Sequence, residues 1–319
     1  MTTAWLMLLV PLSIPVSAWH LADDSPVQRT STATTLTGDE LLRIGALHDA
    51  QNHLPESLTY YQLALSVFRE RRQASGVAAA QLNIGQVYER QGKFREAFEA
   101  LQEAVPVLSR STDKSAEARA LLAMGRVSAR LGRIDRARAS LEKAVFLFNR
   151  VKDRRGWNEA AIRLGFLHLG DGLTEVGLSL LQQARQDARA HQDRGRELAA
   201  MVAYGDANWF LDRAAEARQL YSDSLRLAEA ERDLATEAAL RLRLAHLEGD
   251  AGFLQEGIAS GKRLLWLSQM LRNPAIEAAA WSLLAELYER TQQTAEAEES
   301  EQRALMMYRT RKILVHGGG

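Results

Sequence analysis

The sequence predicts an all-α fold, a right-handed superhelical solenoid built from seven antiparallel helix pairs. Three observations predict this fold: a 40-residue repeat, apolar residues at helical spacing inside each repeat, and small residues at fixed positions where helices would pack closely. The chain has 319 residues, of which 46% are hydrophobic and 25% are charged, the balance of a folded soluble protein.

Small residues recur at every fortieth position through the whole repeat region. The first column holds Gly45, Gly85, Gly125, Gly165, Gly205, Ala245 and Ala285. The second, twelve positions later, holds Ser57, Ala97, Ala137, Gly177, Ala217, Gly257 and Ala297. A period of this length is typical of stacked supersecondary units. We therefore expect seven repeats within residues 37–312, at about 37–74, 75–114, 115–154, 155–194, 195–234, 235–274 and 275–312.

Each repeat contains the signals of two helices. The first helix is expected to end at a glycine turn, because glycine adopts the left-handed conformation easily; the turn glycines are Gly92, Gly132, Gly172 and Gly252. A short side chain that can cap the next helix marks each boundary between repeats, at Asp113, Asp153, Asp193, Asp233 and Asn273. The array opens at Thr37, with Glu40 three residues later, which predicts a capping box.

The pattern resembles the tetratricopeptide repeat (TPR), most clearly in residues 82–88 and 92–97. The resemblance covers about Thr37 to Arg311. This chain departs from it in using 40 residues per unit in place of 34 and in lacking the consensus proline, so it is most similar to the long-unit arrays of kinesin light chain type. The linker Lys152 to Gly156 also resembles, more weakly, the TPR region of bacterial CHAT-domain proteins.

The N-terminal segment has features of an export signal. Ala4 to Val16 form an apolar run that is too short to span a membrane, and small residues stand at the last and third-last positions before Trp19. We expect a signal peptide at 1–18, a flexible spacer at 19–36, a disordered tail at 313–319 and a periplasmic or secreted bacterial protein. Met1 to Thr3 supply no Lys or Arg, so a cytoplasmic protein is the alternative if this segment is not a signal.

The composition excludes several kinds of chemistry. Forty basic and 40 acidic residues leave no surplus positive charge for general nucleic-acid binding. The chain has no Cys, so it cannot form disulfides or use a cysteine nucleophile. His48 and His168 stand in the column that holds Tyr88 and Tyr288, which favours a packing role over metal binding. We expect neither an enzyme nor a metal or cofactor site.

A partner-binding surface is the functional site that the sequence favours. The resemblance implies that exposed positions on the first helices line a concave groove and hold the partner. These positions are Asn83, Gln86, Arg90, Arg119, Arg126, Arg130, Arg163, Phe166, Asp206, Trp209, Phe210 and His246. Such a surface would suit a protein or peptide with an acidic part followed by an apolar part. The alternative is that these arginines only solvate the helices, balanced by Glu89 and Glu159.

The predicted function is a non-enzymatic protein–protein interaction scaffold. Two alternatives stay open: the N-terminal recognition region of a larger protein, for example a CHAT-type peptidase, and a cytoplasmic peptide-sensing regulator. The last repeat bears on this choice. Its second helix carries Glu296, Glu298, Glu299 and Glu301, which suits a polar cap on the array, yet Leu305 to Tyr308 form an apolar patch beside it.

Overall fold

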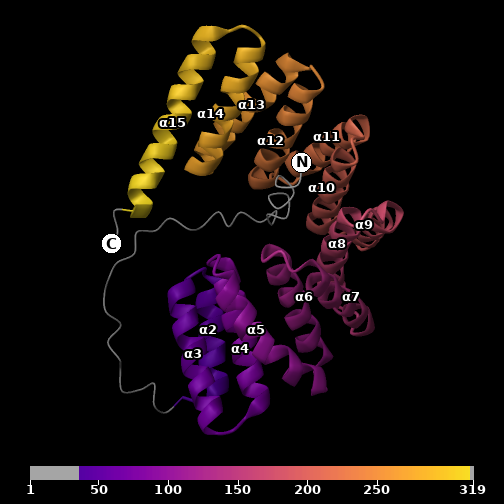
Figure 1. Ribbon diagram of the computed structural model, residues 1–319, viewed down its shortest axis with the longest axis vertical. Coiled ribbons are helices and arrows are strands. Elements are labelled where there is room, and N and C mark those ends of the chain that lie inside the picture. The colour runs from indigo at the N-terminus through magenta and orange to yellow at the C-terminus, as the bar shows by residue number, and fades with distance from the viewer. Residues whose placement is uncertain (1–35, 317–319) are drawn as a thin grey trace. The chain divides into compact units, whose positions relative to one another are not determined.

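The protein is all-α in the part of the chain that the computed structural model describes, residues 36–316, with side chains described through Arg309 (Figure 1). Fourteen helices follow one another there in seven consecutive antiparallel pairs, as the repeat predicted. The predicted signal peptide, most of the spacer and residues 317–319 lie outside the described residues. Among the helices of residues 36–316, none combines the length and the apolar character needed to cross a membrane.

The chain divides into two compact units near residue 180. The helices of the first unit are α2 (Gly38–Ala50), α3 (Leu54–Glu70), α4 (Ala74–Arg90), α5 (Phe94–Arg110), α6 (Lys114–Arg130), α7 (Ile134–Arg150) and α8 (Arg154–Gly170). Helix α9 (Thr174–Ala190) begins in the first unit and ends in the second. The helices of the second unit are α10 (Arg194–Phe210), α11 (Ala214–Ala230), α12 (Leu234–Asp250), α13 (Leu254–Met270), α14 (Pro274–Arg290) and α15 (Thr294–His316).

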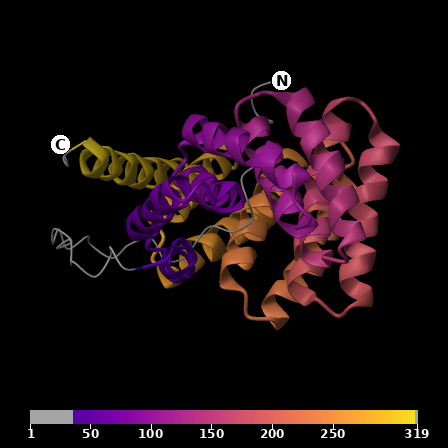
Figure 2. The same ribbon diagram turned by 90° about the horizontal axis from the view of Figure 1, so that it is seen from below.

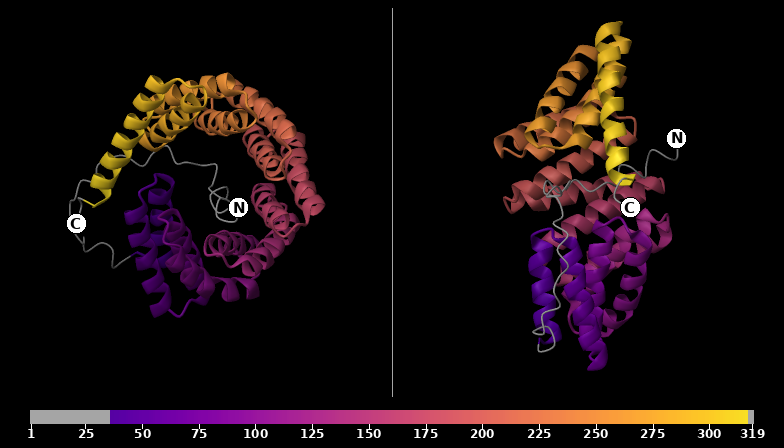
Figure 3. Two further views of the ribbon diagram at one scale, coloured as in Figure 1. Left: turned by 45° about the horizontal axis from the view of Figure 1, so that its top comes forward. Right: turned by 90° about the vertical axis from the view of Figure 1, so that its left-hand side faces the viewer.

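Within each unit, every new first helix packs against the helix pair before it (Figures 2 and 3). In the first unit, α6 packs against α4 and α5 through a core that joins Phe98 and Leu101 to Met124 and Val127. In the second unit, α14 packs against α12 and α13 in the same manner. Within each unit, the next first helix therefore covers the apolar face of the pair before it.

The turns and helix caps are those that the sequence predicted. The turn glycines Gly92, Gly132, Gly172 and Gly252 have φ of 75°, 71°, 79° and 83°, in the left-handed region that glycine adopts without strain. The boundary residues Asp113, Asp153, Asp193, Asp233 and Asn273 each accept a hydrogen bond from the first turn of the following helix. Thr37 and Glu40 form the predicted capping box.

The small-residue column lets paired helices approach closely. A Cβ atom at Gly85 would lie 2.8 Å from Cγ of Leu101, and one at Gly125 would lie 2.6 Å from Cγ of Leu141. Both distances are shorter than real carbon contacts, so glycine is needed there for the bulky residue of the second helix to pack. The result is a close fit between the two helices of a pair, on which the next first helix packs.

Candidate functional site

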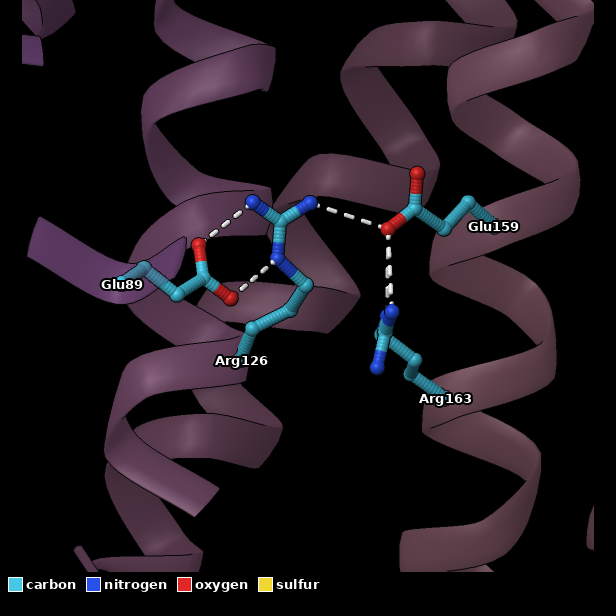
Figure 4. A network of polar contacts seen from close by, with 4 residues as sticks. All are labelled: Glu89, Arg126, Glu159 and Arg163. Carbon is cyan, nitrogen blue, oxygen red and sulfur yellow. Dashed lines mark hydrogen bonds and ion pairs between the residues drawn. The ribbon is translucent and has the colours of Figure 1, made fainter. Parts of the chain in front are cut away.

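The central feature of the first unit is a network of four charged side chains on its first helices (Figure 4). Glu89 comes from the end of α4, Arg126 from α6, and Glu159 and Arg163 from neighbouring turns of α8. Arg126 lies between the two carboxylates and joins three successive first helices. We call the side of α4, α6 and α8 that carries this network the first-helix face of the first unit.

The hydrogen-bond geometry of the network is close. Nε and Nη2 of Arg126 donate to the two carboxylate oxygens of Glu89 at 2.7 and 2.6 Å. The third nitrogen, Nη1, donates to Oε1 of Glu159 at 2.9 Å. Arg163 donates to the same Glu159 oxygen from Nε and Nη2 at 3.3 and 3.1 Å. All three nitrogens of Arg126 are thus engaged, and the bidentate pair with Glu89 is the stronger kind of charge-assisted contact.

Burial and charge act in opposite directions on these groups. Burial alone would lower the pKa of Arg126, but the carboxylates of Glu89 and Glu159 raise that pKa above its ordinary value. For Glu159, burial would raise the pKa, yet Arg126 and Arg163 outweigh it and the pKa falls below 4.5. Burial lowers the pKa of Arg163, and repulsion from Arg126 acts in the same direction. The network holds two positive and two negative charges and is therefore neutral as a whole.

The structure therefore assigns several of the predicted site residues to contacts within the chain. Besides Arg126 and Arg163, Arg90 forms an ion pair with Asp49 of α2. The guanidinium of Arg130 lies 4.8 Å from the ring centre of Phe94. These arginines therefore contribute contacts between helices of the chain itself.

The remaining predicted residues of the first unit are more available to a partner. Arg119 is exposed, and Asn83, Gln86 and Phe166 are half-buried. Gln86, Arg126 and Phe166 occupy the same position in three successive repeats. They lie at the same register position of α4, α6 and α8, because these three helices begin 40 residues apart. A partner that contacts this face would meet amide, guanidinium and aromatic groups in turn.

In the second unit, Asp206 is buried, although the sequence predicted an exposed residue on the partner-binding surface. Its carboxylate is buried, with 4% of the side chain exposed, because it accepts hydrogen bonds from Nε of Arg243 at 2.7 Å and from the hydroxyl of Tyr221 at 2.6 Å. Burial and the neighbouring Asp206 carboxylate raise the pKa of Tyr221. Asp206 therefore serves the interior of the second unit.

The other predicted residues of the second unit lie nearer its surface. Trp209 packs edge-on against Tyr221, with ring centres 6.5 Å apart. Trp209 and Phe210 are half-buried, and His246 is exposed. The aromatic part of the predicted site is thus partly committed to packing.

Ion pairs between successive first helices recur at fixed sequence separations, a feature that the sequence reasoning missed. Glu89 and Arg126 are 37 residues apart, and so are Asp206 and Arg243. Arg290 donates to the carbonyl of Gly249 across 41 residues, the separation that also divides Asp49 from Arg90. A search for acid–arginine pairs just below and just above the 40-residue period would have found this register.

Metal ligation and the role of His48 can be examined in the described residues. No group of three or more His, Asp or Glu side chains in residues 36–309 is arranged to hold a metal ion. His48 stacks on Tyr60 at 5.2 Å between ring centres, which agrees with a packing role.

Comparison with known proteins identifies the repeat and the fold. Residues 31–110 and 76–149 match the tetratricopeptide repeat. No curated protein matches the sequence closely enough to count as a relative. Among solved structures, the chain is similar to a Signal Transduction ATPase with Numerous Domains from Pyrococcus horikoshii that has a tetratricopeptide repeat sensor, at 15% identity and a TM-score of 0.67. That match covers 87% of this chain and 42% of the ATPase, so this chain spans less than half of that protein.

Two Rap proteins are similar along most of their length. A Rap protein complexed with Competence and Sporulation Factor matches at 13% identity and a TM-score of 0.62, covering 90% of this chain and 89% of that one. The Rap conjugation gene regulator of plasmid pLS20, in complex with the Phr* peptide, matches at 15% identity and 0.57, covering 94% and 82%. At these identities the likeness concerns the fold. The repeat match shows tetratricopeptide repeats within residues 31–149, and the seven helix pairs share their fold with these solved structures.

Proposed function

We propose that this protein is a non-enzymatic interaction scaffold that binds a segment of a partner protein or a peptide on the first-helix face of the first unit. One observation carries the proposal: Gln86, Arg126 and Phe166 repeat at one position on three first helices that the Arg126 network holds side by side. A rigid row of this kind can follow an extended segment with little ordering cost on the side of the scaffold.

The chemistry of that face sets the kind of segment it would take. Each nitrogen of Arg126 already donates a hydrogen bond to Glu89 or Glu159, so this arginine adds little attraction for an acidic partner. The exposed Arg119 and the half-buried Phe166 remain as contacts for a carboxylate and an apolar side chain. The predicted partner, with an acidic part followed by an apolar part, would therefore bind mainly through these two side chains.

A peptide-sensing regulator is the second candidate function. The similarity in fold to the pLS20 Rap regulator, which was solved with the Phr* peptide, favours it. A sensor should change its shape when a short peptide binds, whereas a scaffold need not. Any ligand of the folded state raises Tm, so small-angle X-ray scattering with and without a bound peptide, rather than thermal unfolding, separates the two candidates.

Panning a random peptide display library against the purified protein would test the binding face. Selected peptides are then measured against the double variant Arg119→Glu, Phe166→Ala. The matched control is Lys143→Glu, Phe146→Ala, which likewise reverses one positive charge and truncates one phenylalanine, at exposed positions on the second helix α7. We expect the first variant to lose at least tenfold in affinity, and the control to bind as the unchanged protein does. Equal binding by both variants would move the site away from this face.

Export is a separate proposal that depends on residues 1–18. The apolar run and the small residues before Trp19 support it. The intact mass of the protein recovered from its native cells, together with its cell fraction, tests it directly. A mass about 2 kDa below 35.5 kDa in an exported fraction would agree with cleavage after Ala18, whereas an uncleaved chain in the cytoplasm would contradict it.

A further inference from the structure

A second surface, on the last helix pair, has the form of a helix-binding groove. Helices α14 and α15 lie side by side (Figures 1 and 3), and a groove of about 630 Å³ runs between them. Its lining includes Glu286, Glu289, Glu298, Glu301, Leu305 and Tyr308, all of them exposed. Among the described helices of the second unit, only α14 packs extensively against α15.

The earlier repeats show what such a groove accommodates. In the first unit, α6 covers the corresponding surface of α4 and α5 and packs on Phe98 and Leu101. In the second unit, α14 itself covers α12 and α13. The groove between α14 and α15 is therefore shaped for a further helix, by the same packing that builds the rest of each unit.

The last pair differs from the earlier ones in its side chains. Glu298 and Glu301 stand at the repeat positions of Phe98 and Leu101, so the end of the groove near the turn is acidic. Leu305 and Tyr308 stand at the positions of Val105 and Leu108, so the other end stays apolar. An occupant must therefore be apolar at one end and basic at the other.

The charges in the groove are largely unbalanced. Glu286 has only a distant contact with Arg290, at 3.9 Å. Glu289, Glu298 and Glu301 form no ion pair with the side chains that the structure describes. Four carboxylates along one groove repel one another, and a cationic partner would relieve that repulsion.

The register of ion pairs in the earlier repeats identifies where the cations of an occupant would lie. Glu289 stands at the repeat position of Glu89, which receives Arg126 from the next first helix. Glu286 stands at the repeat position of Asp206, which receives Arg243. The two acidic positions that accept an arginine from the next first helix thus recur in the last pair.

We propose that the groove between α14 and α15 binds a basic amphipathic helix of a partner protein. Arginines of that helix pair with Glu286 and Glu289, and its apolar side chains pack on Leu305 and Tyr308. This site is separate from the first-helix face of the first unit, and the proposal does not depend on binding at that face.

The chain itself supplies a suitable probe. A synthetic peptide of α6, residues 114–130, carries Lys114, Arg119, Arg126 and Arg130 against the single acid Glu117. In the protein this helix already docks on a helix pair and places Arg126 on Glu89. The control peptide is α14, residues 274–290, which is net acidic. Fluorescence anisotropy with the purified protein should show binding of the α6 peptide and at least tenfold weaker binding of the α14 peptide.

Charge reversal in both partners locates the site. The variant Glu286→Lys, Glu289→Lys alters only exposed residues, so it should keep its helicity and lose at least tenfold in affinity for the α6 peptide. An α6 peptide carrying Arg126→Glu should bind this variant more tightly than it binds the unchanged protein. If the variant binds the unchanged α6 peptide normally, the peptide occupies another surface, such as the α4–α5 pair, and the proposal is wrong. Equal binding of the α6 and α14 peptides would overturn it as well.

Discussion

The variant Arg126→Met tests whether this arginine stabilises the fold or is available to bind a partner. Methionine keeps most of the aliphatic stem and removes the guanidinium, so the change isolates the charged contacts. In the structure that guanidinium makes three hydrogen bonds to carboxylates, and Glu89 has only 15% of its side chain exposed. Removing it leaves Glu89 buried without a cation.

The expected cost follows from that geometry. Breaking a fully buried ion pair costs about 3–5 kcal/mol. Arg126 keeps 20% of its side chain exposed, and Glu159 keeps 41%, so water offsets part of the loss. We therefore expect about 2–3 kcal/mol of lost stability at neutral pH, which corresponds to a fall in Tm of roughly 3–5 °C for a protein of this size.

Urea and thermal unfolding followed by circular dichroism measure this loss. Arg119→Met is the matched control, because Arg119 lies on the same helix and is exposed, so its loss should cost less than about 0.5 kcal/mol. In the double variant Arg126→Met, Glu89→Gln, the loss should be at least about 1 kcal/mol smaller than the sum of the single losses. If Arg126→Met unfolds at the same urea concentration as the unchanged protein, the network contributes nothing and Arg126 is available for a partner.

Three further predictions concern pH, packing and capping. Because the pKa of Glu159 is lowered on folding, its stabilising contribution is complete above the unfolded value of 4.5 and disappears as pH falls through the folded value. Glu159→Gln should therefore lower Tm at pH 7, and this difference in Tm should shrink as the pH falls further below 4.5; a difference that does not change with pH would exclude this linkage. Gly125→Ala places a Cβ 2.6 Å from Cγ of Leu141 and should cost about 1–3 kcal/mol in urea unfolding, whereas a neutral result would mean that the two helices can move apart freely. Asp153→Ala removes the hydrogen bond that the amide of Gly156 donates at 3.0 Å and should cost about 1 kcal/mol, with Asp153→Asn as the control that retains most of the stability.

The fold could be predicted because its determinants are local and repeated. A glycine such as Gly125 is recognisable in sequence, since it recurs every 40 residues and has one packing role each time. The caps are equally local: Asp153 bonds the amide of Gly156, three residues away. Signals of this kind depend on a few neighbouring residues, and seven copies make them unmistakable.

The site was less predictable because its contacts join residues from different repeats. Whether Arg126 reaches Glu89 and Glu159 depends on the offset between neighbouring helices and on the reach of a long side chain. The repeat period alone fixes neither quantity. The sequence placed these arginines on the correct helices, and it also contained the acids that neutralise them. Predicting which acid pairs with which arginine requires the register between successive first helices. Asp206 was misjudged as exposed for the same reason, since Arg243 and Tyr221 enclose it from other helices.

The two surfaces of this protein therefore differ in how their charges are used. On the first-helix face, a carboxylate from a partner would have to compete with Glu89 and Glu159, which the fold holds within hydrogen-bond distance of Arg126 at high effective concentration. Affinity there must come from side chains outside the network, such as Phe166. In the α14–α15 groove the same positions carry acids without arginines. Because the chain as a whole has equal numbers of acidic and basic residues, the uncompensated acids of that groove are the stronger electrostatic determinant of partner choice.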